Sequence, residues 1–215
     1  MDFIETIKSR RSIRAFKPET PSKAVIKECL DAAIWAPSGS NHQPWEFIIV
    51  SGTELDRIRD IVEEKFVLRM KEVDAFSDVP DFCQERQEEL FEVMGEAAEK
   101  SGFGGGEFFQ KIMRFFDAPV GVFFVTFKRK DNLFTISAVP AVENFLLAAH
   151  SKGLGACWLG IAEICAEDIK AYLGLSENRE IIAPIALGYP DENSPINTFT
   201  RTRAPADKLT TWIGF

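Results

Sequence analysis

Residues 119–127 form a nearly unbroken apolar run, PVGVFFVTF. A strand with so few polar positions has to be buried on both faces, so helices must cover both sides of the sheet that contains it. Residues 135–151 follow as a long apolar helix whose composition suits the interior. The two segments together predict a central sheet sandwiched between helices.

Other segments supply the remaining layers of this sandwich. Apolar spacing, caps and breakers predict helices at residues 21–35, 53–66 and 166–173, and strands at residues 45–50, 156–159 and 181–187. Helices and strands are mixed, with few β-α-β units. Residues 191–215 are irregular and have no core of their own, which favours a tail that lies on a partner subunit.

Residues 66–116 interrupt this pattern. They are charged, contain a helical stretch at residues 82–99 and carry the sequence SGFGGG at residues 101–106. Dense glycine loosens the backbone, so we interpret the segment as a mobile helical insertion within a single domain spanning residues 1–215. The insertion is either a surface excursion without a role or a lid or wall over a ligand site, and its length favours the second.

Composition argues against several classes of protein. The net charge is −8 and no basic stripe is present, so nucleic acid is not expected as the main partner. Two histidines and four scattered cysteines argue against a zinc site and favour buried free thiols. The N-terminus has the pattern of an amphipathic helix, and no apolar run reaches the roughly 20 residues of a membrane span. We therefore expect a soluble cytoplasmic protein without membrane contact.

Two clusters of cations near the chain ends predict a binding site for a phosphate monoester. They are RRSIR at residues 10–14 and RTR at residues 201–203. Guanidinium forks grip phosphate oxygens in pairs, and the hydroxyl in the first cluster adds a further donor. Between the clusters, residues 36–45 (APSGSNHQPW) form a rigid polar turn with amide groups and an aromatic wall, which suits a planar heterocycle. Together these features indicate a flat, phosphorylated cofactor.

Five motifs occur in order along the chain: RxSxR from Arg10, PSGxNxQPW from Pro37, GLGxCWxG from Gly153, LGYP from Leu187 and RxR from Arg201. This set resembles the FMN-dependent nitroreductase family over most of the chain outside the insertion. The resemblance implies an α+β protein with a three-layer α/β/α fold, a central mixed but largely antiparallel sheet, and a C-terminal extension over the partner subunit. It also implies a homodimer that binds two FMN molecules at the subunit interface.

The resemblance assigns the phosphate site to residues of both cation clusters. Arg10, Ser12 and Arg14 would hold the phosphate and part of the ring edge, and Arg201 and Arg203 would complete the phosphate site. Arg11, beside them, is either a further ligand or a solvated cation.

The flavin ring is assigned to the other motifs. Pro37, Ser38, Gly39 and Asn41 would line the isoalloxazine or the ribityl chain, in one subunit or from the other, and the backbone N–H of Gly160 would face flavin N5. No residue is a certain catalytic group. Arg10 is the first candidate for stabilising the reduced flavin, with Lys111 or Arg114 as further candidates.

The implied activity is hydride transfer from NADH or NADPH, through FMN, to a nitroaromatic, a quinone or an activated alkene by a ping-pong mechanism. The chain has no GxGxxG nucleotide motif, in agreement with a dinucleotide that visits the flavin and leaves. Two alternatives stay open. One is a specialised relative that acts as a reductive dehalogenase or fragments the flavin, and the other is a non-catalytic flavin-binding protein.

Overall fold

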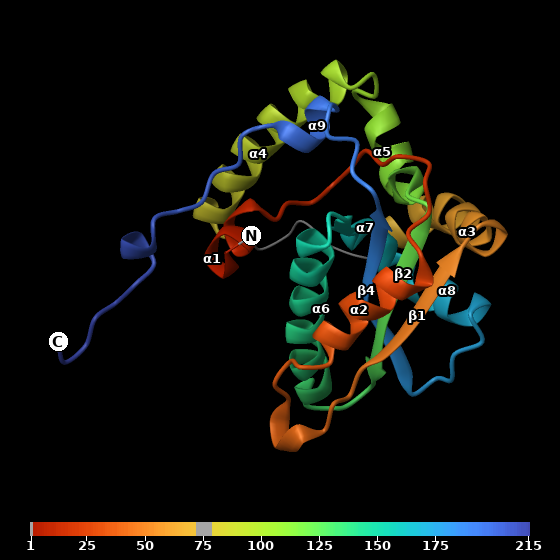
Figure 1. The fold of residues 1–215 in the computed structure, drawn as a ribbon, viewed down its shortest axis with the longest axis horizontal. Helices are drawn as coiled ribbons and strands as arrows, with labels where there is room; N and C mark the ends of the chain where they lie inside the picture. The colour runs from red at the N-terminus through yellow and green to blue at the C-terminus, as the bar shows by residue number, and fades with distance from the viewer. Residues whose placement is uncertain (1, 72–78) are drawn as a thin grey trace.

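The computed structural model describes residues 2–71 and 79–215, which form a four-stranded sheet with helices on both faces (Figure 1). The strand order is β1-β2-β4-β3 and every pair is antiparallel, with β1 at Glu46–Ser51, β2 at Val120–Phe127, β3 at Gly155–Trp158 and β4 at Arg179–Gly188. An isolated bridge between Ser12 and Ala156 is parallel. The strands of the described sheet are thus antiparallel throughout rather than mixed.

The apolar run that predicted a doubly covered strand is β2, which lies between β1 and β4. Its residues from Val120 to Thr126 are buried. Because side chains alternate along a strand, Phe123 and Phe124 point to opposite faces, and each belongs to a different core cluster. The prediction of a strand buried on both faces is confirmed.

Helices complete the two outer layers. One face carries α2 (Lys23–Ala33) and α6 (Leu133–Ser151), with α1 (Phe3–Ser9) against α6. The other face carries α3 (Thr53–Met70), α7 (Gly160–Ile164) and α8 (Ala166–Tyr172). The expected three-layer α/β/α arrangement is confirmed.

Helix α6 is the main core helix of its layer. Among the described residues it alone is long and apolar enough to cross a membrane, with a mean hydropathy of 1.3. Seven of its residues are nevertheless buried. All of them except Ser137 belong to the apolar cluster that α6 forms with α2 and the sheet. Its apolar character therefore has an explanation in the core of this fold. The expectation of buried free thiols is confirmed for Cys29, Cys157 and Cys165, whereas Cys83 is a free thiol that is only partly buried.

The segment expected as an insertion contains two helices, α4 (Asp81–Lys100) and α5 (Gly106–Met113), and a 3-10 turn, η2 (Phe115–Asp117); its residues 72–78 lie outside the described part of the chain. Helix α4 packs on the short helix α9 (Pro195–Thr198) through a cluster of its own that includes Met94 and Ile196. The tail continues past η3 (Ala206–Lys208) and leaves the body of the molecule (Figure 1). Its placement over a partner subunit stays a prediction.

Candidate active site

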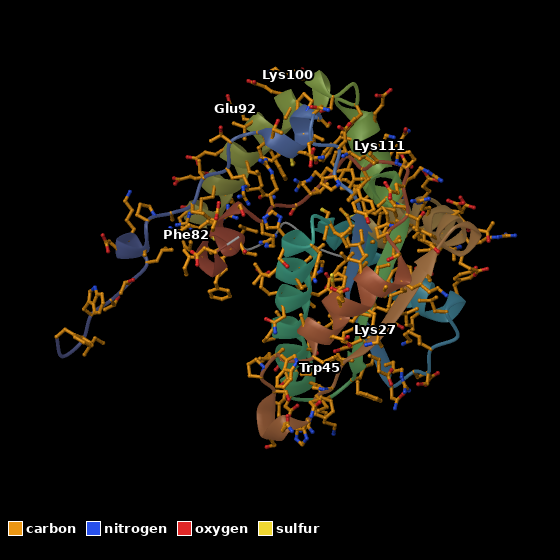
Figure 2. All side chains as sticks on the ribbon, viewed as in Figure 1. Lys27, Trp45, Phe82, Glu92, Lys100 and Lys111 are labelled. Atoms are coloured by element: carbon orange, nitrogen blue, oxygen red, sulfur yellow. The ribbon has the colours of Figure 1, made fainter. Side chains whose placement is uncertain are left out.

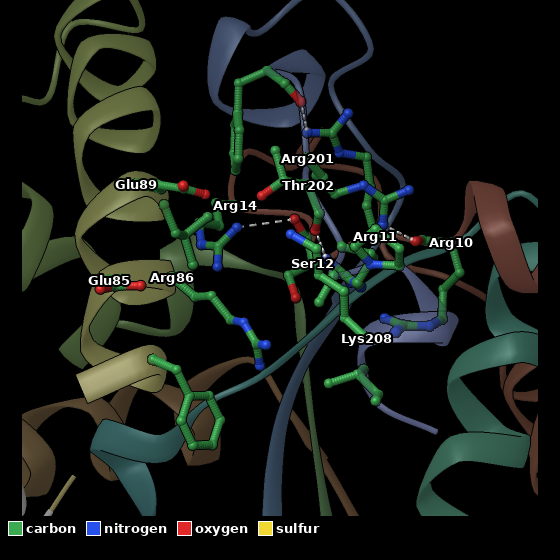
Figure 3. Close-up of a pocket in the computed structure, with 17 residues that line it drawn as sticks. Arg10, Arg11, Ser12, Arg14, Glu85, Arg86, Glu89, Arg201, Thr202 and Lys208 are labelled. Carbon is green, nitrogen blue, oxygen red and sulfur yellow. Dashed lines mark hydrogen bonds between the residues drawn. The ribbon is translucent and has the colours of Figure 1, made fainter. Parts of the chain in front are cut away.

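A cavity of about 630 Å³ lies where the loop after α1, helix α4 and the C-terminal tail meet (Figure 3). The two cation clusters are far apart in sequence but line the same cavity. It is bounded by all six residues predicted for the phosphate site: Arg10, Arg11, Ser12, Arg14, Arg201 and Arg203. The structure thus brings the predicted cationic residues together on one side of a single cavity.

The loop that carries the first cluster is fixed against the edge of the sheet. The N–H of Ile13 donates to the carbonyl oxygen of Ala156 at 3.0 Å, beside the bridge from Ser12. A Cβ atom at Gly155 would lie 2.7 Å from Cγ1 of Ile13, so only a glycine allows this close approach. Gly155 of the GLGxCWxG motif therefore helps to position the phosphate-site loop.

Asn197 holds the same loop from the other side, and the sequence analysis did not find it. Its Oδ1 accepts hydrogen bonds from the N–H groups of Arg14 at 2.7 Å and Ala15 at 3.2 Å. Its Nδ2 donates to the carbonyl oxygens of Ala15 and Asp191 at 2.8 and 2.9 Å. A buried amide with every group satisfied fixes the backbone around it. No motif marks this asparagine, because its role depends on where α9 packs.

Backbone carbonyl groups orient several of the arginines. Arg11 donates from Nη2 to the carbonyl oxygen of Phe199 at 2.6 Å, and its guanidinium lies 5.0 Å from the centre of that ring. Arg201 donates to the carbonyl oxygens of Arg10 and Lys8. The Arg10 Nε atom lies 3.3 Å from Oε1 of Glu143 on α6. These contacts hold the cations in place. Those of Arg11 and Arg201 are to neutral carbonyl groups, whereas that of Arg10 is to a carboxylate.

The electrostatics of the cavity favour an anion. The Nε atoms of Arg10 and Arg11 are buried and make no hydrogen bond, although that of Arg10 is within ion-pair distance of Glu143. Burial, and then the charges of Arg201 and Arg14, lower the pKa of Arg11. Burial and the neighbouring Arg203 and Arg10 lower that of Arg201 in the same way. Cations that destabilise one another in this way gain stability when a phosphate binds between them.

The opposite wall of the cavity is α4, as Figure 3 shows, and the sequence analysis named none of its residues as part of a site. Phe82, Arg86 and Leu90 line the cavity from three successive turns, together with Glu85 and Glu89. The spacing of four residues places the first three on one helical face, which is the signal that could have identified them. The prediction that the insertion supplies a wall of a ligand site agrees with this placement.

The polar turn lies outside the cavity. Residues Gly39–Asn41 form a 3-10 turn, η1, in which the Gly39 N–H donates to Oγ of Ser137 near the start of α6 at 3.3 Å. Ser40, Asn41 and Gln43 have φ values of 50°, 55° and 49°, in the sparsely populated left-handed region. Trp45, at the end of this turn, and Phe82, in the cavity wall, lie far apart (Figure 2). Pro37, Ser38, Gly39 and Asn41 are thus not brought to the cavity of their own chain.

Three further predicted residues also lie outside the cavity lining. Gly160 begins α7, and a Cβ atom there would have no neighbour within 4 Å, so packing in this chain does not require glycine. Lys111 pairs with Asp117 at 2.5 Å and Arg114 with Glu63 at 2.7 Å. Both cations are engaged by carboxylates on the α3 side of the sheet.

Comparison with known proteins places these features in a family. The family model for the nitroreductase family matches residues 7–189. The chain belongs to the nitroreductase family. A 4-nitrobenzoate reductase from Pseudomonas putida is 29% identical over 100% of this chain and 96% of its own length.

Solved structures resemble this nitroreductase family member over its full length. A variant of the FMN- and NADPH-dependent nitroreductase NfnB from Sphigopyxis sp. strain HMH superposes with a TM-score of 0.89 and 26% identity, over 100% of both chains. A BluB-like flavoprotein from Clostridium difficile 630 superposes with a TM-score of 0.71 and 25% identity, over 99% of both chains. The fold of the chain is therefore closer to the first of these structures than to the second.

Proposed function

We propose that this protein is an FMN-dependent oxidoreductase that uses NADH or NADPH to reduce a nitroaromatic, a quinone or an activated alkene. The observation that carries the proposal is a single cavity lined by both cation clusters, with the Nε atoms of Arg10 and Arg11 buried and making no hydrogen bond. This donor set fits the phosphate of FMN. The bound flavin supplies the redox chemistry between donor and acceptor.

The residues of the chain divide into holding and positioning groups. Ser12, Arg14, Arg201 and Arg203 bind the phosphate, and Arg10 and Arg11 add positive charge along the same side of the cavity. Asn197 and Glu143 keep the loop and Arg10 in place through the contacts described above. The open space at Gly160 leaves room for a flat ring beside the backbone of α7.

We also propose a homodimer in which the polar turn serves the flavin of the partner. Within one chain the turn contacts α6 at Ser137, whereas Ser9, next to the cation cluster, contacts His150 at 2.8 Å near the other end of that helix. The helix rises 1.5 Å per residue, so these contacts are roughly 20 Å apart. A second subunit can bring a polar turn to the cavity that its own turn does not reach. The buried free thiols favour the cytoplasm as the compartment.

The higher TM-score to the NfnB structure than to the BluB-like flavoprotein favours the nitroreductase assignment. The deciding experiment is an absorbance spectrum of the purified protein, followed by anaerobic titration with NADH and NADPH. We expect flavin bands that bleach with the nucleotide and return with a nitroarene. Donor and acceptor that use one cavity in turn give parallel double-reciprocal plots.

Other outcomes of this titration would contradict the proposal. A colourless protein that does not bind added FMN would exclude a flavoenzyme. A bound flavin that neither nucleotide bleaches would support the flavin-binding protein instead.

A further inference from the structure

The cavity holds more positive charge than a flavin phosphate needs. Seven cationic and two acidic side chains line it. A phosphate monoester adds at most two negative charges, so the cavity remains positive after it binds. The excess includes a cation on α4, far in sequence from both phosphate-site clusters. A negative group on a reactant would neutralise part of the positive charge that remains.

Arg86 on α4 is the cation best placed for such a group. Its guanidinium lies 5.0 Å from the centre of the Phe82 ring, and its side chain points into the cavity from the wall opposite Ser12 (Figure 3). No described carboxylate is within ion-pair distance of it, although Glu85 and Glu89 are on the same helix. The pair therefore offers an unneutralised guanidinium fork beside an exposed aromatic face.

We propose that Arg86 and Phe82 form a second anion subsite, distinct from the phosphate site, for a planar reactant that carries a negative group. A guanidinium binds a carboxylate or a phosphate through paired hydrogen bonds, and the neighbouring ring packs against a flat reactant. The group is either the carboxylate of an aromatic acceptor or the 2′-phosphate next to the adenine of NADPH. This inference rests on the proposed function and specifies in addition that one reactant carries a negative charge.

The test compares ligands that differ in charge but little in shape. Benzoate and benzamide represent the acceptor, and 2′-AMP and adenosine represent the dinucleotide. Dissociation constants are measured by calorimetry on the FMN-loaded protein. We expect one anion of the two pairs to bind at least about 10-fold more tightly than its neutral partner, as for a hydrogen bond to a charged group. The pair that shows this preference identifies the source of the negative group.

Variants of α4 then locate the preference. Arg86 is exposed, so Arg86→Gln leaves the fold intact. This variant should reduce the anion preference about 10-fold, with the dissociation constant of the neutral ligand unchanged. Arg86→Lys should retain part of it. Lys100→Gln removes an equal charge from the exposed end of the same helix, outside the cavity, and should change nothing.

Two results would overturn the subsite. One is the same anion preference in Arg86→Gln as in the unchanged protein, or no preference in either. The other is a loss of FMN affinity in Arg86→Gln as large as that caused by replacing the phosphate-site residue Arg203 with alanine, which would place Arg86 in the flavin site itself. FMN binding and bleaching by NADPH are recorded on the same samples, so that a failure of the proposed function is recognised separately.

Discussion

Arg203 and Arg14 are the phosphate-site cations with the fewest competing contacts. In the described part of the chain, Arg203 donates to the neighbouring Thr202 carbonyl at 2.7 Å and Arg14 to the Ser12 carbonyl at 3.3 Å, and neither pairs with a carboxylate. Most of their donors are therefore available to a ligand. We expect Arg203→Ala and Arg14→Ala each to weaken FMN binding by about 1.5–3 kcal/mol, the range for a hydrogen bond to a charged group.

Titration of the apoprotein with FMN, followed by the quenching of flavin fluorescence, measures this loss. Arg57→Ala is the matched control, because Arg57 is exposed on α3 and outside the cavity. Unchanged FMN affinity in both cavity variants would show that the FMN phosphate does not bind at this site.

His150 makes the apoprotein sensitive to acid. Burial, and then the charges of Arg10 and Arg201, lower the pKa of His150 in the folded protein. As pH falls below about 6.5, the unfolded chain takes up a proton that the folded chain resists, so the free energy of unfolding decreases. We expect His150→Gln, which can keep the contact to Ser9, to lose less stability than the parent between pH 7.5 and pH 5.5. Urea unfolding at the two pH values measures the difference, and equal losses would contradict the assignment.

At this scale the sequence predicted one side of the site and missed the other. Arg10 and Arg203 could be found because guanidinium groups at short spacing have few uses other than binding anions or carboxylates. Asn197 could not, because it reaches the loop through the packing of α9, which no local pattern encodes. The four-residue spacing that includes Arg86 marks a helical face, but it does not show that this face meets the cation clusters. Lys111, which the sequence also suggested, could bind the flavin only by giving up its ion pair with Asp117.

Among the elements, the turn η2 shows what the sequence did not predict. The strands and most helices were predictable from apolar spacing, but Phe115, Phe116 and Asp117 have φ values of 57°, 52° and 54°, and no glycine marks the turn. Two of these residues are buried phenylalanines. Left-handed backbone at consecutive non-glycine residues is unfavourable, so surrounding contacts must maintain it.

Arg59 of α3 supplies those contacts. This buried guanidinium donates to the carbonyl oxygens of Arg114 at 2.8 Å and Ala118 at 2.6 Å, on the two sides of the turn, and pairs with Asp56 at 2.6 Å. Arg59→Met would leave both carbonyl groups without these donors. We expect it to lower the free energy of unfolding by about 3 kcal/mol, since each lost bond to a charged group contributes about 1.5–3 kcal/mol and relaxation recovers part.

Urea denaturation compares this variant with Arg57→Met, which makes the same change on the exposed face of the same helix. The control should lie within about 0.5 kcal/mol of the parent. Similar values for the two variants would mean that packing of the phenylalanines, and not Arg59, maintains the turn.

For the whole molecule, the decisive feature is an apolar surface without a cover. Large apolar side chains are exposed on α1, on α6 and in the tail: Phe3, Ile4, Ile7, Leu133, Ile136, Val139, Leu209, Trp212, Ile213 and Phe215. Helices α1 and α6 are in contact, so their exposed side chains lie on adjoining elements. Exposed apolar surface of this extent is typical of an interface, which agrees with the proposed homodimer.

Ile136 offers the sharpest test of this interface. It is 60% exposed on α6, one residue before the serine that receives the polar turn, whereas Val67 is 63% exposed on α3, in the opposite layer. Ile136→Glu would place an unpaired charge in the dimer interface at a cost of several kcal/mol, or about a 100-fold or larger increase in the dimer dissociation constant. Val67→Glu places the same charge at a similarly exposed position and should leave the dimer intact.

Sedimentation velocity with detection at the flavin wavelength follows mass and cofactor together. If two subunits complete each flavin site, Ile136→Glu should sediment as a monomer and lose FMN in the same concentration range. A parent protein that sediments as a monomer with FMN bound would show instead that one chain suffices for the site.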